Sequence, residues 1–344
     1  MLDHRNITLE NLAIGYNKAD RSAALLSGIS ARAQGGEMIA VVGANGVGKS
    51  TLLRTIIGLM PPIDGTVLIE GADIKSYSTA ELALIFGFVG TTNMSSQNLT
   101  VFELVSLGRF PYTNWIGKLM NSDKEVIERS VYNVGLEDFM DRKLSEMSDG
   151  ERQRANIARV LAQDSRYIVL DEPTAFLDLP NRYELVSLLR KIVNNDLKTV
   201  IYTTHDLQIA IKESDKIWLL NKLGLKEGSP EDLMLSKDFS NQFPESDLEF
   251  DTKSGNYISP SSSIGKVELI ADKEYYDITL LALKRLKLDV VNNNRELLVK
   301  VIEADNGVAW DIQYKGNIHR FLTIYDLSIY IRRYIISDSE GDDS

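Results

Sequence analysis

The sequence contains no cysteine, and it contains histidine only at His4, His205 and His319. Without cysteine the chain can form no disulfide, thiolate metal site or cysteine nucleophile, which suits a reducing compartment. Three scattered histidines argue against a histidine-rich metal cluster.

Long apolar runs and an excess of basic charge are also missing. No stretch reaches the roughly 20 apolar residues that cross a bilayer, and the charged start from Met1 to Glu10 is unlike a signal peptide. We therefore expect any work at a membrane to go through a partner protein. The net charge of −11 disfavours a broad face for nucleic acid, so no nucleic-acid partner is expected.

The residues that are present suit a globular α/β protein. With 344 residues, 44% of them hydrophobic, the chain can form one large domain with an appendage, or two domains. Short apolar runs alternate with segments of helical periodicity, which predicts an α/β core with a parallel sheet. The expected strands are 7–14, 37–43, 66–69, 167–171, 199–203 and 216–220, and the expected helices are 50–59 and 183–193.

Helical periodicity is densest from about 79 to 163, so we expect a helical subdomain there. Thr100 and Glu103 form a capping-box pair, which predicts the start of a helix.

A change of composition divides the chain. Serine, asparagine, proline and glycine accumulate in 239–263, which we interpret as a connecting segment that follows a first domain of residues 1–238. Residues 264–336 then show strand and helix periodicity of their own and predict a small α+β C-terminal domain. The acidic tail, 337–344, is expected to fray.

A glycine-rich segment lies between a predicted strand and a predicted helix. Glycine lets backbone N–H groups point at phosphate oxygens, and the N-terminus of the helix adds positive potential. Lys49 is expected to neutralise the β- and γ-phosphates of ATP, and Ser50 to ligate Mg²⁺. The alternative, a plain glycine-rich turn, is disfavoured by the strand and helix on either side. The candidate nucleotide-binding residues are Gly43, Ala44, Asn45, Gly46, Val47, Gly48, Lys49, Ser50 and Thr51.

Two carboxylates end the predicted buried strand 167–171. Asp171 can hold Mg²⁺ through water, and Glu172 can orient and polarise the attacking water. Carboxylates so close to a core are costly unless they have a partner or a purpose. A pair that merely caps the next turn is the alternative.

The order of the motifs resembles that of ABC ATPases. Ser148-Asp-Gly-Glu-Arg-Gln-Arg154 precedes Asp171 by about twenty residues, Pro173-Thr-Ala-Phe-Leu-Asp178 follows that strand, and Thr204-His205-Asp206 follows the next. The resemblance covers roughly residues 7–231. It implies a P-loop ATPase core with antiparallel β and helical subdomains, with ATP and Mg²⁺ as cofactors.

The resemblance also implies a homodimer in which each ATP lies between the phosphate loop of one chain and the signature motif of the other. Ser148 and the Gly150 backbone would then contact the γ-phosphate, with Asp178 at the dimer seam. His205 would contact the γ-phosphate and sense its loss. Tyr16 stands where the family has an aromatic residue that stacks on adenine, with edge packing as the alternative.

The sequence departs from the family pattern in two places. The signature reads Met147-Ser-Asp-Gly-Glu rather than Leu-Ser-Gly-Gly-Gln, but it keeps the serine and second glycine that supply the phosphate contacts. The glutamine expected after Phe86–Val89, which helps to hold Mg²⁺, is missing. Thr91 is its positional equivalent and a candidate metal-site residue, while Gln97 could serve only if the loop folds back.

The segment Leu99–Thr113 resembles the part of iron–siderophore, haem and vitamin B12 importers that touches the permease. Arg109, Phe110 and Tyr112 are interface candidates, or else subdomain core. We therefore expect the ATPase subunit of an importer. It would lie peripherally on the cytoplasmic face of the inner (plasma) membrane, bound to permease subunits and serving a substrate-binding protein indirectly.

Two other functions remain open on the sequence alone: a soluble ABC ATPase acting on ribosomes or DNA, and a nucleotide-sensing regulatory module. The C-terminal domain is expected to regulate or stabilise the dimer, or alternatively to be a packing extension. Its lone His319 is expected to be structural.

Overall fold

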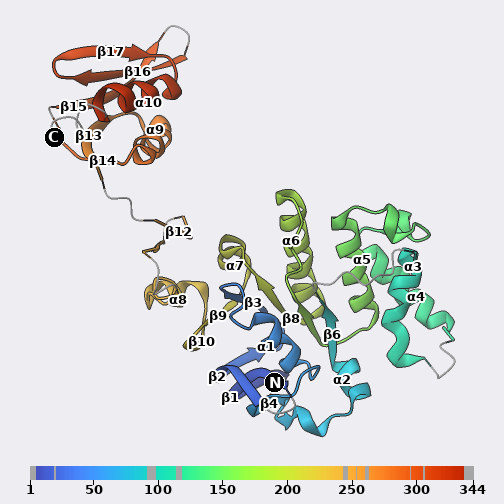
Figure 1. Ribbon diagram of the computed structural model, residues 1–344. Helices are drawn as coiled ribbons and strands as arrows, with labels where there is room; N and C mark the ends of the chain where they lie inside the picture. Colours follow the sequence, from blue (N-terminus) through green and yellow to red (C-terminus); the bar gives the residue numbers. More distant parts are fainter. Residues whose placement is uncertain are drawn as a thin grey trace. The chain divides into compact units, whose positions relative to one another are not determined.

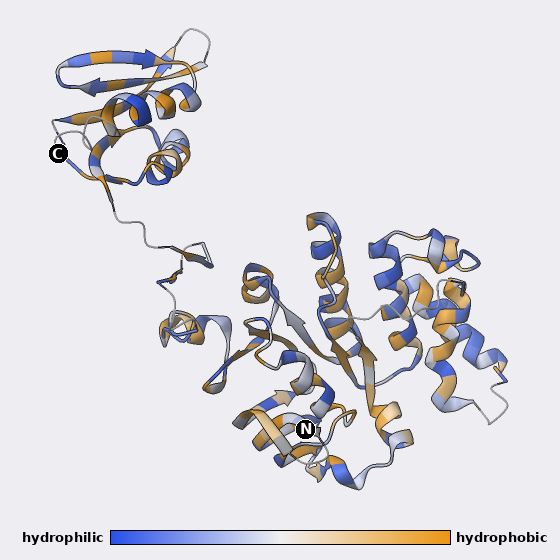
Figure 2. Cartoon of the chain, in the orientation of Figure 1, coloured by the Kyte–Doolittle hydropathy of each residue, from blue (hydrophilic) through white to orange (hydrophobic). Residues whose placement is uncertain are grey.

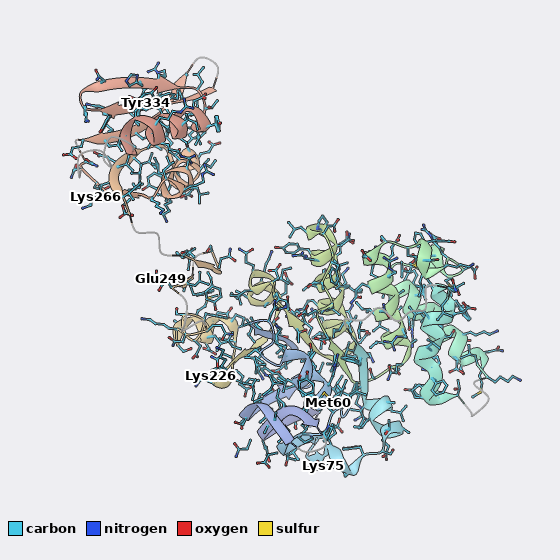
Figure 3. The ribbon with its side chains drawn as sticks, in the orientation of Figure 1. Met60, Lys75, Lys226, Glu249, Lys266 and Tyr334 are labelled. Atoms are coloured by element: carbon cyan, nitrogen blue, oxygen red, sulfur yellow. The ribbon has the colours of Figure 1, made fainter. Side chains whose placement is uncertain are left out.

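The computed structural model describes residues 5–18, 21–90, 98–113, 118–242, 247–252, 254–259, 263–294, 296–304 and 307–336 (Figure 1). The chain divides into two compact units, Met1–Ile258 and Ser259–Ser344. Figure 3 labels Glu249 of the first unit and Lys266 of the second, on either side of this boundary in the sequence. None of the described helices is long and apolar enough to cross a membrane.

A six-stranded sheet forms the centre of the first unit. In spatial order its strands are β10 (Gly224–Gly228), β9 (Lys216–Asn221), β3 (Met38–Gly43), β8 (Thr199–Thr204), β7 (Tyr167–Leu170) and β6 (Phe86–Val89). All neighbours pair in parallel except the edge strand β10, which is antiparallel to β9.

The inner strands of the sheet are buried on both faces, and they therefore appear in the sequence as largely apolar runs. Along β3, Met38 and Ala40 join one hydrophobic cluster, whereas Ile39 and Val41 join a second cluster on the other face. Figure 2 shows the hydrophobic colouring of these central strands. The first cluster is shared with α5 (Asp149–Ala162), α6 (Leu179–Asp196) and α7 (Leu207–Glu213), and the second with α1 (Lys49–Ile56).

A four-stranded antiparallel sheet completes the second cluster. Its order is β2 (Arg21–Gln34), β1 (Asn6–Lys18), β4 (Asp64–Ile69) and β5 (Ala72–Asp73). It is followed by the short η1 (Ile74–Ser76) and by α2 (Thr79–Ile85), whose Leu82 and Ile85 pack against the same cluster.

A helical insert separates β6 from β7. Its elements are α3 (Val101–Ser106), η2 (Leu107–Tyr112), α4 (Asn121–Asn133), η3 (Glu137–Phe139), η4 (Leu144–Glu146) and α5. The capping box is present: Thr100 Oγ1 accepts from Glu103 N at 3.2 Å, and the Glu103 carboxylate accepts from Thr100 N at 2.8 Å. The range expected for the helical subdomain, about 79–163, therefore takes in α2 and β6, which pack with the central sheet.

The segment expected to connect the domains, 239–263, is largely part of the first unit. After α8 (Pro230–Leu235), a hairpin of β11 (Glu249–Asp251) and β12 (Asn256–Ile258) packs back on the core. Phe239 is fully buried and stacks on Phe250 at 4.8 Å, and the Tyr257 hydroxyl donates to the Phe239 carbonyl at 2.8 Å. Aromatic packing thus holds the described residues Phe239, Phe250 and Tyr257 together in a segment whose composition suggests a loop.

The second unit has a mixed sheet and a core of its own. The strand order is β14 (Leu288–Val290), β13 (Gly265–Ile270), β15 (Leu297–Ala304), β16 (Gly307–Tyr314) and β17 (Asn317–Phe321), with α9 (Lys273–Arg285), α10 (Ile324–Ile331) and η5 (Arg332–Ile336). Val267, Val299 and Ile312 form the core with Leu283 and Ile331. The short strands β14 and β17 were not expected from the sequence.

Candidate active site

The phosphate loop joins β3 to α1, as its sequence context predicts. Gly48 caps α1 with φ 114°, a left-handed backbone that glycine adopts at little cost. Gly43 ends β3 beside β9, where an added Cβ would lie 2.4 Å from the Leu220 carbonyl oxygen. These two positions therefore require glycine for reasons of backbone shape.

Lys49 is buried at the base of this loop. Its Nζ donates to the carbonyl oxygens of Gly43 at 2.9 Å and Ala44 at 3.1 Å, and the residue is 5% exposed. Burial lowers the pKa of Lys49, while the charges of Glu172 and Asp171 act in the opposite direction. The loop fixes the Lys49 amine through two carbonyl oxygens, within electrostatic reach of both strand-end carboxylates.

Asp171 leaves one carboxylate oxygen without a partner. Its Oδ1 accepts from Ser50 Oγ at 2.9 Å and from Thr203 Oγ1 at 3.0 Å, whereas its buried Oδ2 has no hydrogen-bond partner. An orphaned carboxylate oxygen beside a serine hydroxyl is a donor set that suits Mg²⁺, so the residues present fit this ion.

Glu172 and His205 meet at the carboxyl edge of the sheet. The strands β7 and β8 are parallel neighbours, so the residues that follow them emerge at the same edge. His205 Nε2 lies 2.6 Å from Glu172 Oε1. Glu172 has φ 51°, which is a strained backbone for a residue with a side chain.

Tyr16 lies on β1 close to the start of α1. Its hydroxyl is 3.4 Å from Thr51 Oγ1, and the residue is 51% exposed. Half of this aromatic surface is therefore accessible beside the phosphate loop, as a role against adenine would require.

The signature segment and Asp178 come together across two helices. Ser148 caps α5, and an added Cβ on Gly150 would lie 2.9 Å from Asn181 Oδ1. Asn181 in turn donates from its backbone N (3.1 Å) and its Nδ2 (2.6 Å) to Asp178 Oδ1, the cap of α6. Ser148, Gly150 and Asp178 therefore form one neighbourhood, centred on Asn181.

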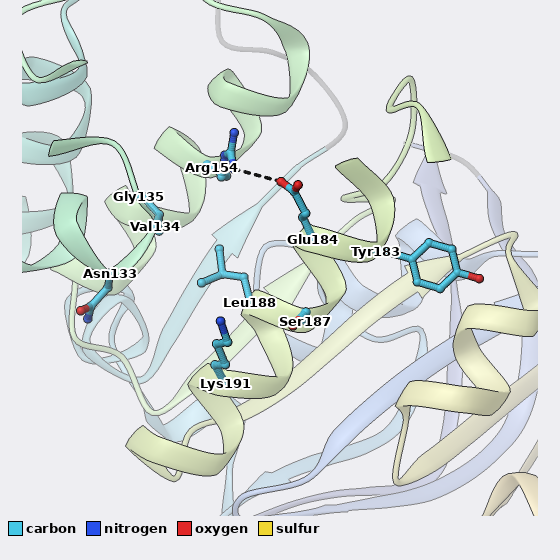
Figure 4. Close-up of a pocket in the computed structure, with 9 residues that line it drawn as sticks. All are labelled: Asn133, Val134, Gly135, Arg154, Tyr183, Glu184, Ser187, Leu188 and Lys191. Carbon is cyan, nitrogen blue, oxygen red and sulfur yellow. Dashed lines mark hydrogen bonds and ion pairs between the residues drawn. The ribbon is translucent and has the colours of Figure 1, made fainter. Parts of the chain in front are cut away.

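The same helices form an ion pair further along. Arg154 Nη1 of α5 lies 3.2 Å from Glu184 Oε2 of α6, at the edge of an open hollow that also reaches the end of α4 (Figure 4). Over the ranges that the structure describes, no hydrogen bond or ion pair joins Ser148 or Asp178 to the phosphate loop.

The loop after β6 holds the two candidates for the role of the missing glutamine. Thr91 and Gln97 both lie outside the described residues. Asp171 N donates to the carbonyl of Val89 at 2.8 Å, so the chain enters this loop beside the candidate metal ligand.

The candidates for the permease interface differ in burial. Arg109 is mostly buried in the helical insert, whereas Phe110 is exposed. The Arg109 side chain is 11% exposed, bonds Asp123 Oδ1 from Nε at 2.9 Å and donates to the Ala162 carbonyl from Nη1 at 2.9 Å. Arg109 is therefore structural in the helical insert. Phe110 is 73% exposed and stays available to a partner.

Sequence reasoning missed Thr203, which contacts both strand-end carboxylate residues. The signal was a hydroxyl at the end of an otherwise apolar strand, but only the pairing of β7 with β8 places it beside Asp171.

A glycine-rich loop on a strand–helix junction, a buried loop lysine, and a serine bonded to a strand-end aspartate together define a P-loop nucleoside triphosphatase. The family model described as ABC transporter matches residues 26–175. An uncharacterized ABC transporter ATP-binding protein of Methanocaldococcus jannaschii is 37% identical over 261 residues, which are 76% of this chain and 85% of that protein. The chain belongs to the ABC transporter ATP-binding family, and it is an ATPase.

Two further comparisons concern transporters. A protein of Bacillus subtilis named as a probable siderophore transport system ATP-binding protein, YusV, is 36% identical over 66% of this chain and 82% of its own length. One solved structure is described as an inward-facing conformation of a putative metal-chelate type ABC transporter. One of its chains is similar to this protein, with TM-score 0.61 and 29% sequence identity. That match covers 71% of this chain and 90% of the other.

Proposed function

We propose that the chain is the ATP-hydrolysing subunit of an importer for metal chelates of the iron–siderophore, haem or cobalamin type. Similarity to the siderophore-transport protein of Bacillus subtilis and to the solved transporter of the metal-chelate type supports this substrate class. The resemblance of residues 99–113 to the permease-contacting part of such importers also supports it.

The observation that carries the ATP-hydrolysing part of this proposal is the convergence of four side chains at the carboxyl edge of the sheet. Lys49 would neutralise phosphate charge, Ser50 and Asp171 would hold Mg²⁺, and Glu172 would accept a proton from the attacking water. The ion, when bound, neutralises charge that develops on the phosphates. His205, 2.6 Å from Glu172, would orient that carboxylate and contact the γ-phosphate.

We propose a head-to-tail homodimer as the working form. Ser148 and Gly150 lie beside Asp178, and within the described ranges no hydrogen bond joins them to the chain's own phosphate loop. A second chain is therefore the natural source of their nucleotide. ATP would close the dimer, and hydrolysis with release would reopen it.

The partner we propose is a pair of permease subunits in the inner (plasma) membrane. The chain would lie on their cytoplasmic face, and a substrate-binding protein would act on the other side. Phe110, exposed on the helical insert, is an aromatic anchor of the kind that dominates interface energies. The exposed part of Tyr112 lies two residues away.

Co-purification from detergent extracts tests this function directly. A tagged chain should bring down a hydrophobic permease whose presence stimulates ATP hydrolysis. Ribosomes or DNA in place of a permease would support a soluble ABC ATPase, and the absence of all three would support a nucleotide-sensing module.

We propose in addition that the second unit regulates or stabilises the dimer. Its core is built from residues between Val267 and Ile335, so the unit can fold around its own apolar side chains. An extension that only covers the ATPase would have less need of a core of its own.

A further inference from the structure

One buried hydroxyl touches both strand-end carboxylate residues. Thr203, in β8, is 0% exposed. Its Oγ1 donates to Asp171 Oδ1 at 3.0 Å and accepts the backbone N–H of Glu172 at 2.7 Å. A hydroxyl has one proton to donate and lone pairs to accept with, so both bonds form at once.

Strand pairing creates this contact. In the parallel ladder of β7 and β8, Leu170 is the partner of Tyr202. The next residue of the chain is Asp171, which directly follows β7, in one case and Thr203, within β8, in the other. The hydroxyl is therefore supplied by a rigid strand rather than by a loop.

The bond to Glu172 holds a strained piece of backbone. Glu172 has φ 51°, a conformation that persists only where surrounding contacts fix it. The N–H that Thr203 accepts belongs to this same residue. The hydroxyl thereby fixes the peptide from which the Glu172 carboxylate reaches His205.

The bond to Asp171 fixes the orientation of the other carboxylate. Two donors, Ser50 Oγ and Thr203 Oγ1, occupy Oδ1, and this leaves Oδ2 without a partner. Without Thr203, one hydroxyl alone would hold the group, and its free oxygen would no longer point in one direction.

We propose that Thr203 is a positioning residue for ATP hydrolysis. It holds the carboxylate suited to Mg²⁺ and the backbone of the candidate general base in one arrangement, without contacting nucleotide itself. The inference rests on the roles proposed above for Asp171 and Glu172. It predicts an effect on turnover and on divalent-ion affinity, with little effect on nucleotide affinity.

The test compares three variants of the full-length chain. Thr203→Val removes the hydroxyl and keeps the shape, whereas Thr203→Ser keeps the hydroxyl. Thr199→Val is the matched control, because Thr199 is 2% exposed on the same strand and its hydroxyl, like that of Thr203, accepts one hydrogen bond and donates another. Its Oγ1 accepts from Gly36 N at 3.0 Å and donates to the Gln34 carbonyl at 3.2 Å, away from the carboxylates.

Three quantities are measured for each: kcat against Mg²⁺ concentration, affinity for a fluorescent ATP analogue, and Mn²⁺ binding with a non-hydrolysable ATP analogue by electron paramagnetic resonance. We expect Thr203→Val to lower kcat at least about tenfold and to weaken Mn²⁺ binding several-fold, with analogue affinity within about twofold of wild type. Thr203→Ser should restore most of both losses, and Thr199→Val should change neither.

Equal losses in Thr203→Val and Thr199→Val, with Mn²⁺ binding unchanged, would show that the hydroxyl is only structural and would overturn the inference. A Thr203→Val chain as active as the wild type would overturn it as well, while the proposed function stands. If Glu172→Gln also hydrolyses ATP normally, the site assignment itself fails, and the inference fails with it.

Discussion

His205 Nε2 lies 2.6 Å from Oε1 of Glu172, although 33 positions separate the two residues in the chain. The histidine follows β8 and the glutamate follows β7, so the pairing of two parallel strands makes this contact. A ring nitrogen this close restricts the glutamate carboxylate to one side of the site. The contact is a geometric reason for proposing Glu172 as the general base.

Glu172→Gln should lower ATP turnover at least about 100-fold, since an amide cannot accept the proton of the attacking water. ATP binding should persist, and ATP should then drive stable dimers that light scattering detects. Glu70→Gln is the control. It removes a carboxylate whose Oε1 lies 2.7 Å from Arg166 Nη1, and this ion pair is not at the strand ends that hold Glu172 and His205. Hydrolysis near the wild-type rate would remove Glu172 from its role.

Lys49→Ala should weaken nucleotide binding itself, by about tenfold or more, because a charge-assisted bond to phosphate is lost. Titration with a fluorescent ATP analogue measures this. The exposed Lys75 supplies the control, and Lys75→Ala should bind like the wild type. Unchanged affinity in Lys49→Ala would mean that the loop does not hold phosphate as proposed.

Thr91→Ala should reduce Mg²⁺-dependent hydrolysis several-fold while Gln97→Ala changes little, if Thr91 takes the place of the usual glutamine. The physical reason is that a threonine hydroxyl can still bond a metal-bound water. The hydrolysis rates of both variants, measured over a range of Mg²⁺ concentrations, distinguish Thr91 from Gln97 as the residue in this role. The opposite ranking would assign the role to Gln97.

Asp123→Asn should destabilise the helical insert. Asp123 accepts from Met120 N and from Arg109 Nε, both at 2.9 Å. The hydrogen bond from the Met120 N–H lowers the pKa of Asp123 below its usual value, and the Arg109 guanidinium adds to this effect in the same direction. Because the folded pKa is the lower one, this stabilisation is complete above the unfolded pKa of about 4 and is lost as pH falls through the folded value.

We therefore expect Asp123→Asn to lower the free energy of unfolding by about 1–3 kcal/mol at pH 7, and by less below about pH 4. Urea unfolding at several pH values measures the difference. The exposed Asp141 gives a control variant, Asp141→Asn, which should unfold in urea like the wild type at every pH. If Asp123→Asn lowers the free energy of unfolding by the same amount at pH 3 and at pH 7, the charge of Asp123 does not provide the stabilisation.

Truncation after Ser263 should give a soluble protein that still hydrolyses ATP, because the core of the second unit lies wholly beyond that point. A regulatory unit predicts an altered basal rate or dimer lifetime in the shortened chain, measured by phosphate release and light scattering. Aggregation would indicate a packing extension instead. Unchanged stability, dimerisation and transport would rule out both roles.

The parts of the site that local sequence determines were predictable. The phosphate loop, the paired carboxylates and the Thr100 capping box each need only a few consecutive residues. Contacts set by strand register were not, and Thr203 is the clearest case. The strand β17 was missed because four of its five residues are exposed and give no alternation. The packing of the β11–β12 hairpin was missed because it depends on Phe239 stacking on Phe250 and accepting a hydrogen bond from the Tyr257 hydroxyl, 11 and 18 positions further along the chain.

Burial on both faces of β3 has a consequence for how the chain can diversify. Every residue of that strand lies against one cluster or the other, or against the backbone of β9, so nearly any substitution there disturbs packing. The edge strand β17, in contrast, is exposed at four of its five residues, so we expect most substitutions there to cost little packing. Mutational scanning should find the intolerant positions gathered in β3 and the permissive ones along β17. We therefore expect sequence variation to gather on the exposed residues of β17 and to spare β3, the strand that leads into the phosphate loop.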